Sequence, residues 1–109
     1  MILIYDEDRL FCESLRRAAH KSGVTVVSCY NDSDFWQSLM LRRKEIAGVV
    51  VSHSLVKPLI AAPLARRLAD TPIVITGGSQ RPAETAKLAN VVYIQKRAGI
   101  PAVLSRILH

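Results

Sequence analysis

One stretch of the chain, residues 47–54 (AGVVVSHS), constrains the fold more than any other. Its apolar part shows no polar alternation, and a run of β-branched residues that is apolar on both faces is typical of a parallel strand covered by helices on both sides. The stretch ends in Ser52, His53 and Ser54. Because open α/β sheets place their sites at the carboxyl ends of such strands, we expect a site there that offers hydroxyls and an imidazole but no carboxylate.

Short apolar runs of this kind alternate with helical patterns along the whole chain. Strands are expected at residues 2–5, 24–30, 47–52, 73–76 and 91–94, and helices at about 8–22, 32–44, 63–69, 82–89 and 100–108. Asp8 and the polar residues 31–34 supply N-caps, Gly23 ends the first helix, and residues 42–44 are expected in the last turn of the second helix. Trp36, Leu39 and Met40 belong to the apolar stripe expected on that helix. Five strands alternating with five helices predict an α/β fold, a doubly wound (βα)5 five-stranded parallel sheet in a three-layer α/β/α arrangement.

The length and composition set further bounds. A chain of 109 residues is expected to form a single domain, residues 1–109, without a metal or disulfide to stabilise it. No run reaches the roughly 18 to 20 apolar residues of a membrane span, and the N-terminus has no basic signal-peptide region. We therefore expect a cytoplasmic protein without membrane association. The two cysteines, Cys12 and Cys29, are interpreted as reduced thiols in or near the core.

The net charge of +6 raises the question of nucleic-acid binding. The basic residues occur as pairs and triplets, namely 16–17, 42–44, 66–67 and 96–97. This scatter favours solvated helix faces, and the chain contains no recognition-helix or aromatic stacking motif. A basic nucleic-acid-binding module is therefore retained as an alternative, with affinity that would fall steeply with salt.

Three expected strand ends carry distinctive polar groups. Asp6 and Glu7 follow the first strand, Thr76 ends the fourth, and Lys96 follows the fifth. In a doubly wound sheet these ends converge on one edge. Acids beside a lysine and a hydroxyl suit a divalent cation and a phosphoryl group, the acids holding the metal through oxygen.

On these residues the chain resembles the receiver domains of two-component response regulators. Residues 2–7 (ILIYDE) match the family's first strand and acidic pair, residues 72–76 (PIVIT) its fourth strand with a switch threonine, and residues 93–96 (YIQK) its fifth strand and lysine. The resemblance implies a flavodoxin-like fold and a switch aromatic at Tyr93, although Tyr93 is equally well interpreted as an ordinary strand aromatic. In such domains an aspartate that ends strand three accepts a phosphoryl group, and magnesium is held by that aspartate and the acidic pair.

Two departures from the family pattern decide the interpretation. Arg97 follows Lys96, where the family usually has a proline. The phosphoacceptor aspartate is missing, since no Asp or Glu occurs between Glu45 and Asp70. Strand length places the acceptor position at Ser52, whereas the distance to the next proline places it at Ser54, and Ser52 is preferred.

A serine cannot replace the aspartate chemically without help. A carboxylate is ionised and nucleophilic at pH 7 and also binds metal, whereas a hydroxyl needs a nearby base. His53 cannot serve Ser52 while the strand is extended, because adjacent residues point to opposite faces. We therefore expect a degenerate phosphorylation pocket formed by Asp6, Glu7, Ser52, Thr76 and Lys96, with both acids facing Lys96 in an ion pair or network. Catalytic residues and cofactors are not expected, and only a weak magnesium site at Asp6 and Glu7 is conceivable.

The resulting hypothesis is a phosphorylation-independent pseudo-receiver, which is not an enzyme and which signals through protein contacts. It would be the N-terminal domain of a longer bacterial regulator that acts on an attached or partner effector, such as a transcription regulator, and DNA would be bound only through an attached domain. The family commonly dimerises through helix four, strand five and helix five. Here that homodimer or partner face would comprise Lys87, Tyr93, Gln95, Arg97, Val103 and Arg106. The alternative is a receiver that still accepts phosphate on an unconventional residue.

Overall fold

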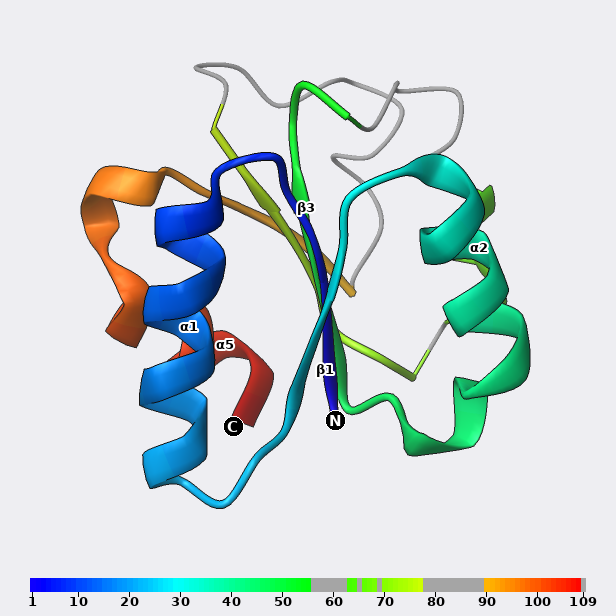
Figure 1. Cartoon of the computed structure of the whole chain (residues 1–109), viewed down its shortest axis with the longest axis horizontal. Coiled ribbons are helices and arrows are strands. Elements are labelled where there is room, and N and C mark those ends of the chain that lie inside the picture. The colour runs from blue at the N-terminus through cyan, green and yellow to red at the C-terminus, as the bar shows by residue number, and fades with distance from the viewer. Residues whose placement is uncertain (56–62, 65, 69, 78–89, 109) are drawn as a thin grey trace.

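Five parallel strands form one sheet in the computed structural model of the chain, which describes residues 1–55, 63–64, 66–68, 70–77 and 90–108 (Figure 1). The strands are β1 (Ile2–Tyr5), β2 (Val26–Cys29), β3 (Gly48–Ser52), β4 (Ile73–Thr76) and β5 (Val91–Ile94). Their order across the sheet is β2-β1-β3-β4-β5, and every neighbouring pair is parallel. This confirms the doubly wound parallel sheet and places the stretch at residues 48–52 on its central strand.

Helices cover both faces of the sheet, as Figure 1 shows. The described elements are α1 (Arg9–Lys21), α2 (Asp32–Leu41), α5 (Ile100–Leu108) and two 3-10 helices, η1 (Arg43–Glu45) and η2 (Lys96–Ala98). Helix α1 packs with α5 on one face, and α2 lies on the other with the helical residues 63–64 and 66–67. The helix expected at 82–89 and part of the one expected at 63–69 lie outside the described residues.

Side chains of the sheet alternate between two apolar cores. The core beneath α1 and α5 contains Ile2, Ile4, Val50 and Val74, and the core beneath α2 contains Leu3, Tyr5, Val49, Val51, Ile73 and Ile75. All five residues of β3 are buried, as its unbroken apolar pattern predicts. Gly48 permits this packing, because a Cβ atom on it would lie 2.4 Å from Cγ2 of Ile107 in α5.

Capping residues set the ends of the first two helices. Asp8 accepts a hydrogen bond from the backbone N–H of Phe11 at 3.1 Å, and Asn31 accepts one from Asp34 at 2.8 Å. Gly23 follows α1 with a φ of +74°, a conformation that favours glycine. These caps confirm the N-terminal and C-terminal signals in the sequence.

Several sequence-based expectations need correction. Strand β2 is shorter than 24–30, and helix α2 ends at Leu41, so residues 42–44 follow the helix instead of forming its last turn. After α2 the chain forms η1 and then contacts the start of β1, where the N-terminal ammonium of Met1 donates to the carbonyl of Glu45 at 2.9 Å and the Met1 carbonyl accepts from the N–H of Ala47 at 2.7 Å. Met40, expected on the buried stripe, is 76% exposed.

No helix in the described ranges is both long enough and apolar enough to cross a membrane.

Candidate functional site

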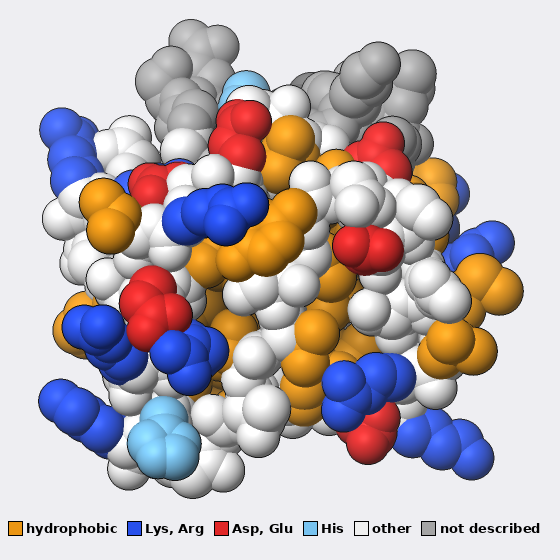
Figure 2. Space-filling view, in the orientation of Figure 1, with side chains coloured by type: hydrophobic (Ala, Val, Ile, Leu, Met, Phe, Trp, Pro, Cys, Tyr) orange, Lys and Arg blue, Asp and Glu red, His pale blue; other side chains and the backbone are white. Residues whose placement is uncertain are grey.

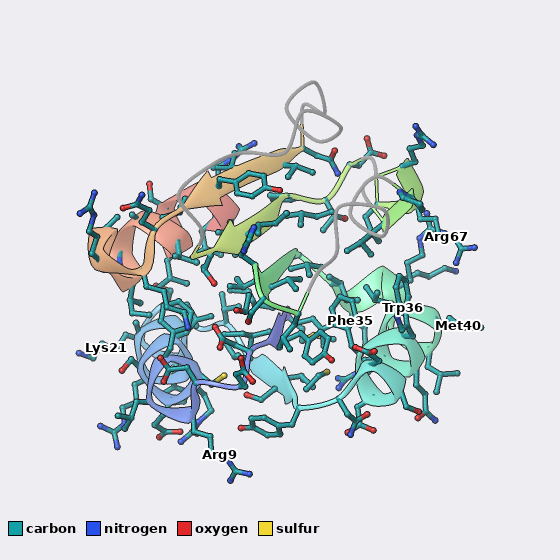
Figure 3. The ribbon with its side chains drawn as sticks, turned by 90° about the horizontal axis from the view of Figure 1, so that it is seen from above. Arg9, Lys21, Phe35, Trp36, Met40 and Arg67 are labelled. Atoms are coloured by element: carbon teal, nitrogen blue, oxygen red, sulfur yellow. The ribbon has the colours of Figure 1, made fainter. Side chains whose placement is uncertain are left out.

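The carboxyl ends of β1, β3 and β4 lie next to one another at the edge of the sheet onto which Figure 3 looks. Ser52, at the end of β3, is paired in register with Thr76, at the end of β4. Asp6 follows β1 directly, and Lys96 follows β5 after one intervening residue. The polar strand ends singled out in the sequence therefore belong to one edge of the sheet.

Lys96 makes the principal electrostatic contacts of the site. Its Nζ lies 2.9 Å from Oδ2 of Asp6, 3.5 Å from Oδ2 of Asp8, and 4.9 Å from the ring centroid of Phe11. The Asp6 side chain is 1% exposed, whereas that of Lys96 is 32% exposed. Burial lowers the pKa of Lys96, but the contacts with Asp6 and then Asp8 outweigh it, so that the pKa lies above its ordinary value. Lys96 is therefore held as an ammonium that neutralises a buried carboxylate.

Asp6 has both carboxylate oxygens engaged. Oδ1 accepts a hydrogen bond from the backbone N–H of Asp8 at 2.8 Å, and Oδ2 faces Lys96. Asp8 combines two roles, since it caps α1 and also pairs with Lys96. The backbone N–H of Phe11, followed by Lys96, lowers the pKa of Asp8 below its ordinary value. The sequence suggested only the capping role, although the acidic run 6–8 was a signal for the second.

Glu7 lies apart from Lys96, contrary to the expectation that both acids face it. Glu7 is exposed, and its Oε1 accepts a hydrogen bond from the Ser54 hydroxyl at 3.2 Å. The Oγ atoms of Ser54 and Ser52 are 2.9 Å apart. The acids separate because the chain at the end of a strand still directs successive side chains to opposite sides, so Asp6 and Asp8 share the side of Lys96. Ser54 was weighed in the sequence only as the second candidate for the acceptor position.

Ser52 and Thr76 present hydroxyls in place of a carboxylate. Ser52 is the last residue of β3 and is 8% exposed. The Thr76 carbonyl accepts the backbone N–H of His53 at 2.7 Å, and the Thr76 hydroxyl is buried without a hydrogen bond to any described residue. His53 itself is exposed. The described edge thus contains hydroxyls beside an ion pair.

These residues do not fit a magnesium site of the receiver type. Magnesium takes oxygen ligands in near-octahedral geometry and is bound through carboxylates, yet β3 ends in the neutral Ser52 hydroxyl and the exposed Glu7 is hydrogen-bonded to Ser54. Within the ranges that the structure describes, no three His, Cys, Asp or Glu side chains form a group that could hold a metal ion.

The expected partner face is only partly on the surface. Gln95 and Arg97 are exposed, Arg106 is partly buried, and Tyr93 is partly buried against the core on the α2 side of the sheet. Val103 is fully buried on the side of α5 that faces the sheet, so its inclusion in the face was wrong. The helical period turns it toward the sheet together with Leu104 and Ile107. Lys87 lies outside the described residues.

Comparison with solved structures identifies the fold. The chain is similar to the signal receiver domain of an HD domain-containing protein from Pseudomonas fluorescens Pf-5, with a TM-score of 0.78, 17% sequence identity, and coverage of 98% of this chain and 90% of that one. It is also similar to an atypical orphan response regulator described as having a new phosphorylation-independent regulatory mechanism, with a TM-score of 0.73, 15% identity, and coverage of 97% and 90%.

A third similar structure is the signal receiver domain of a modulated diguanylate cyclase from Desulfovibrio desulfuricans G20, described as an example of alternate folding, with a TM-score of 0.69, 19% identity, and coverage of 98% and 89%. No protein-family model matches the sequence, and no curated protein matches it. The shared architecture extends over nearly the whole of each chain. The chain therefore has the fold of a signal receiver domain.

Proposed function

We propose that the chain is a phosphorylation-independent pseudo-receiver, a signalling module that acts by binding protein. The observation that carries the proposal is the pairing of Lys96 with Asp6 at 2.9 Å, beside a strand β3 that ends in Ser52. A receiver that depends on phosphate needs a carboxylate at the end of β3, whereas this chain offers a hydroxyl. Near that hydroxyl, Asp6 pairs with Lys96, and Ser54 contacts both Ser52 and Glu7.

The surroundings of Ser52 give its hydroxyl little nucleophilic assistance. Attack on phosphorus requires a base that removes the hydroxyl proton. The hydrogen-bond neighbour of Ser52 is another hydroxyl, that of Ser54, and the Glu7 carboxylate beyond it is exposed to solvent. We infer that the site fixes one conformation of the domain and does not carry a phosphoryl group.

The neighbour described as phosphorylation-independent supports this proposal by analogy of fold. We propose that signalling passes through a homodimer or a protein partner at the surface formed by Tyr93, Gln95, Arg97 and Arg106. The chain would then be the N-terminal domain of a cytoplasmic bacterial regulator, with an attached or separate effector such as a transcription regulator. DNA would be contacted by that effector and not by this domain, and the domain itself would perform no catalysis.

The test of phosphate independence uses magnesium and beryllofluoride, which together mimic a phosphorylated receiver. We expect the NMR spectrum of the wild-type protein to remain unchanged during the titration. The matched variant is Ser52→Asp, which restores a carboxylate at the end of β3 and should gain a magnesium-dependent response. A saturable change in the wild-type protein that is lost in Ser52→Ala would contradict the proposal.

The test of the partner face is separate. We expect light scattering to show self-association that decreases on Arg97→Glu, while Lys21→Glu, an equal charge reversal on α1, leaves it unchanged. A strictly monomeric wild-type protein would rule out the homodimer and leave a different protein as the partner.

A further inference from the structure

A groove between α2 and residues 63–64 and 66–68 has no role in the pocket described above. The floor of the groove is apolar and is formed by Leu39, Leu64 and Leu68, which are all buried. Trp36 and Met40 form its α2 side. Its volume is about 230 Å³, and the lining is mainly apolar. The groove therefore offers apolar contact to another molecule on the face of the sheet opposite α1 and α5.

The rim of the groove is positively charged. Arg43 and Arg67 line it, both are exposed, and neither forms an ion pair with a described residue. Arg43 donates a hydrogen bond to the backbone carbonyl of Arg67 on the other side of the groove. No described Asp or Glu lines the groove. Two guanidinium groups thus flank an apolar surface that is lined by no described carboxylate.

The acids of α2 lie at the other end of the helix and are already engaged. Asp32 accepts a hydrogen bond from the Tyr5 hydroxyl, and Asp34 accepts one from Asn31. Figure 3 shows Met40 and Arg67 reaching outward, Trp36 between α2 and the segment that carries Arg67, and Phe35 turned inward. In Figure 2, hydrophobic and basic side chains lie next to each other at the α2 edge. Met40 is 76% exposed, and its flexible thioether can adapt to different apolar shapes.

We propose that this groove binds an acidic amphipathic helix from another protein, with its apolar side chains against Trp36 and Met40 and its carboxylates on Arg43 and Arg67. Charge complementarity selects this occupant. A second copy of the chain would bring a net charge of +6 and the same two arginines to the contact. A lipid surface is disfavoured, since the apolar floor is recessed and does not protrude. The inference rests on the proposed function in one respect, that the domain binds protein, and it concerns a different face.

The groove contains its own reporter, because Trp36 is the single tryptophan of the chain. The probe is a synthetic helix of roughly four turns with Leu or Phe at i, i+3, i+4 and i+7 and Glu at the solvent-facing positions. The control peptide keeps the apolar face and replaces each Glu with Lys. We expect a saturable change in Trp36 fluorescence with the acidic peptide and affinity at least about tenfold weaker with the basic one.

Variants of the protein assign the binding to the groove. The double variant Arg43→Glu/Arg67→Glu should lose about tenfold in affinity for the acidic peptide and gain affinity for the basic one. Met40→Asp should also weaken binding, and because the Met40 side chain is 76% exposed the substitution removes little core packing. Lys21→Glu, at the end of α1, is the matched control and should bind as the wild type does. Urea unfolding of each variant checks that it is folded.

Three results would overturn the inference. The first is equal affinity for the acidic and basic peptides, and the second is no fluorescence change with either peptide. The third is that a second copy of the chain or a lipid surface occupies the groove. The former would be seen as dimerisation that Met40→Asp abolishes, and the latter as stronger binding to anionic phospholipid vesicles than to the acidic peptide. The beryllofluoride experiment on Ser52 does not involve this groove, so each proposal can fail without the other.

Discussion

Replacing Lys96 with methionine is expected to destabilise the protein through Asp6. The variant keeps a long apolar side chain over Phe11 but leaves a carboxylate that is 1% exposed without its cation at 2.9 Å. Removing one partner of a buried ion pair costs about 3 to 5 kcal/mol. Lys96 is 32% exposed, so solvent screens part of the interaction and we expect a loss of about 2 kcal/mol in the free energy of unfolding.

Removing the carboxylate instead of the ammonium should cost less stability. Asp6→Asn keeps the size of the side chain and an oxygen for the Asp8 N–H, and Lys96 retains Asp8 and solvent. We expect a loss of about 1 kcal/mol. The double variant Asp6→Asn/Lys96→Met no longer buries an unpaired charge, so it should be more stable than Lys96→Met alone. A coupling energy of about 1 kcal/mol is expected from the double-mutant cycle.

Urea unfolding followed by Trp36 fluorescence measures the stability of the wild type and of the three variants, since Trp36 packs against the core and is the single tryptophan.

The pH dependence of the free energy of unfolding tests the direction of the Lys96 contribution. Because the pKa of Lys96 is raised above 10.5 in the folded state, its contribution is complete below that pH and is lost as the pH rises through the raised value. In Lys96→Met this alkaline loss should be absent. The reasoning would be refuted if the stability losses of the two single variants added up to that of the double variant, or if Lys96→Met were as stable as the wild type.

Three further changes test the framework around the site. Gly48→Ala should lower the free energy of unfolding by about 1 to 3 kcal/mol, because the added Cβ would lie 2.4 Å from Cγ2 of Ile107. In an Ile107→Ala background most of this loss should disappear, and urea unfolding of the variants in both backgrounds measures it. Burial, followed by the hydrogen bond to Asp32, raises the pKa of Tyr5 to about 12. The wild type should therefore lose stability between pH 10 and 12, and Tyr5→Phe should lose less over the same range. Parallel curves of stability against pH for the two proteins would contradict this. Asn31→Ala should cost about 1 kcal/mol by removing the cap of α2, and an unchanged midpoint of thermal unfolding would show that the cap contributes nothing.

The parallel sheet could be predicted because each strand carries its own local signal. The stretch 48–52 is apolar on both faces, and the structure buries every residue of it at the centre of the sheet. The ends of α2 and β2 were less predictable, since they depend on contacts between distant parts of the chain. The hydrogen bonds of Met1 with residues 45 and 47 are an example, because no local pattern around residue 42 encodes them.

The site was predictable as a set of strand ends but not as a set of contacts. Topology alone brings Asp6, Thr76 and Lys96 to one edge. Which acid reaches Lys96 depends on how the chain leaves β1, and this directs Asp8 toward the lysine and Glu7 toward Ser54. The groove beside Trp36 was also missed, because it joins side chains from two helical segments far apart in the sequence. The signal available in the sequence was a methionine, Met40, followed closely by the basic residues 42–44.

The central claim is that the domain works without phosphoryl transfer. It is tested most directly by intact-mass spectrometry after incubation of the protein with magnesium and acetyl phosphate, with Ser52→Ala and His53→Ala as matched variants. We predict an unmodified mass for the wild-type protein and an unchanged Trp36 fluorescence spectrum. A saturable phosphoryl adduct on the wild type that disappears in either variant would contradict it.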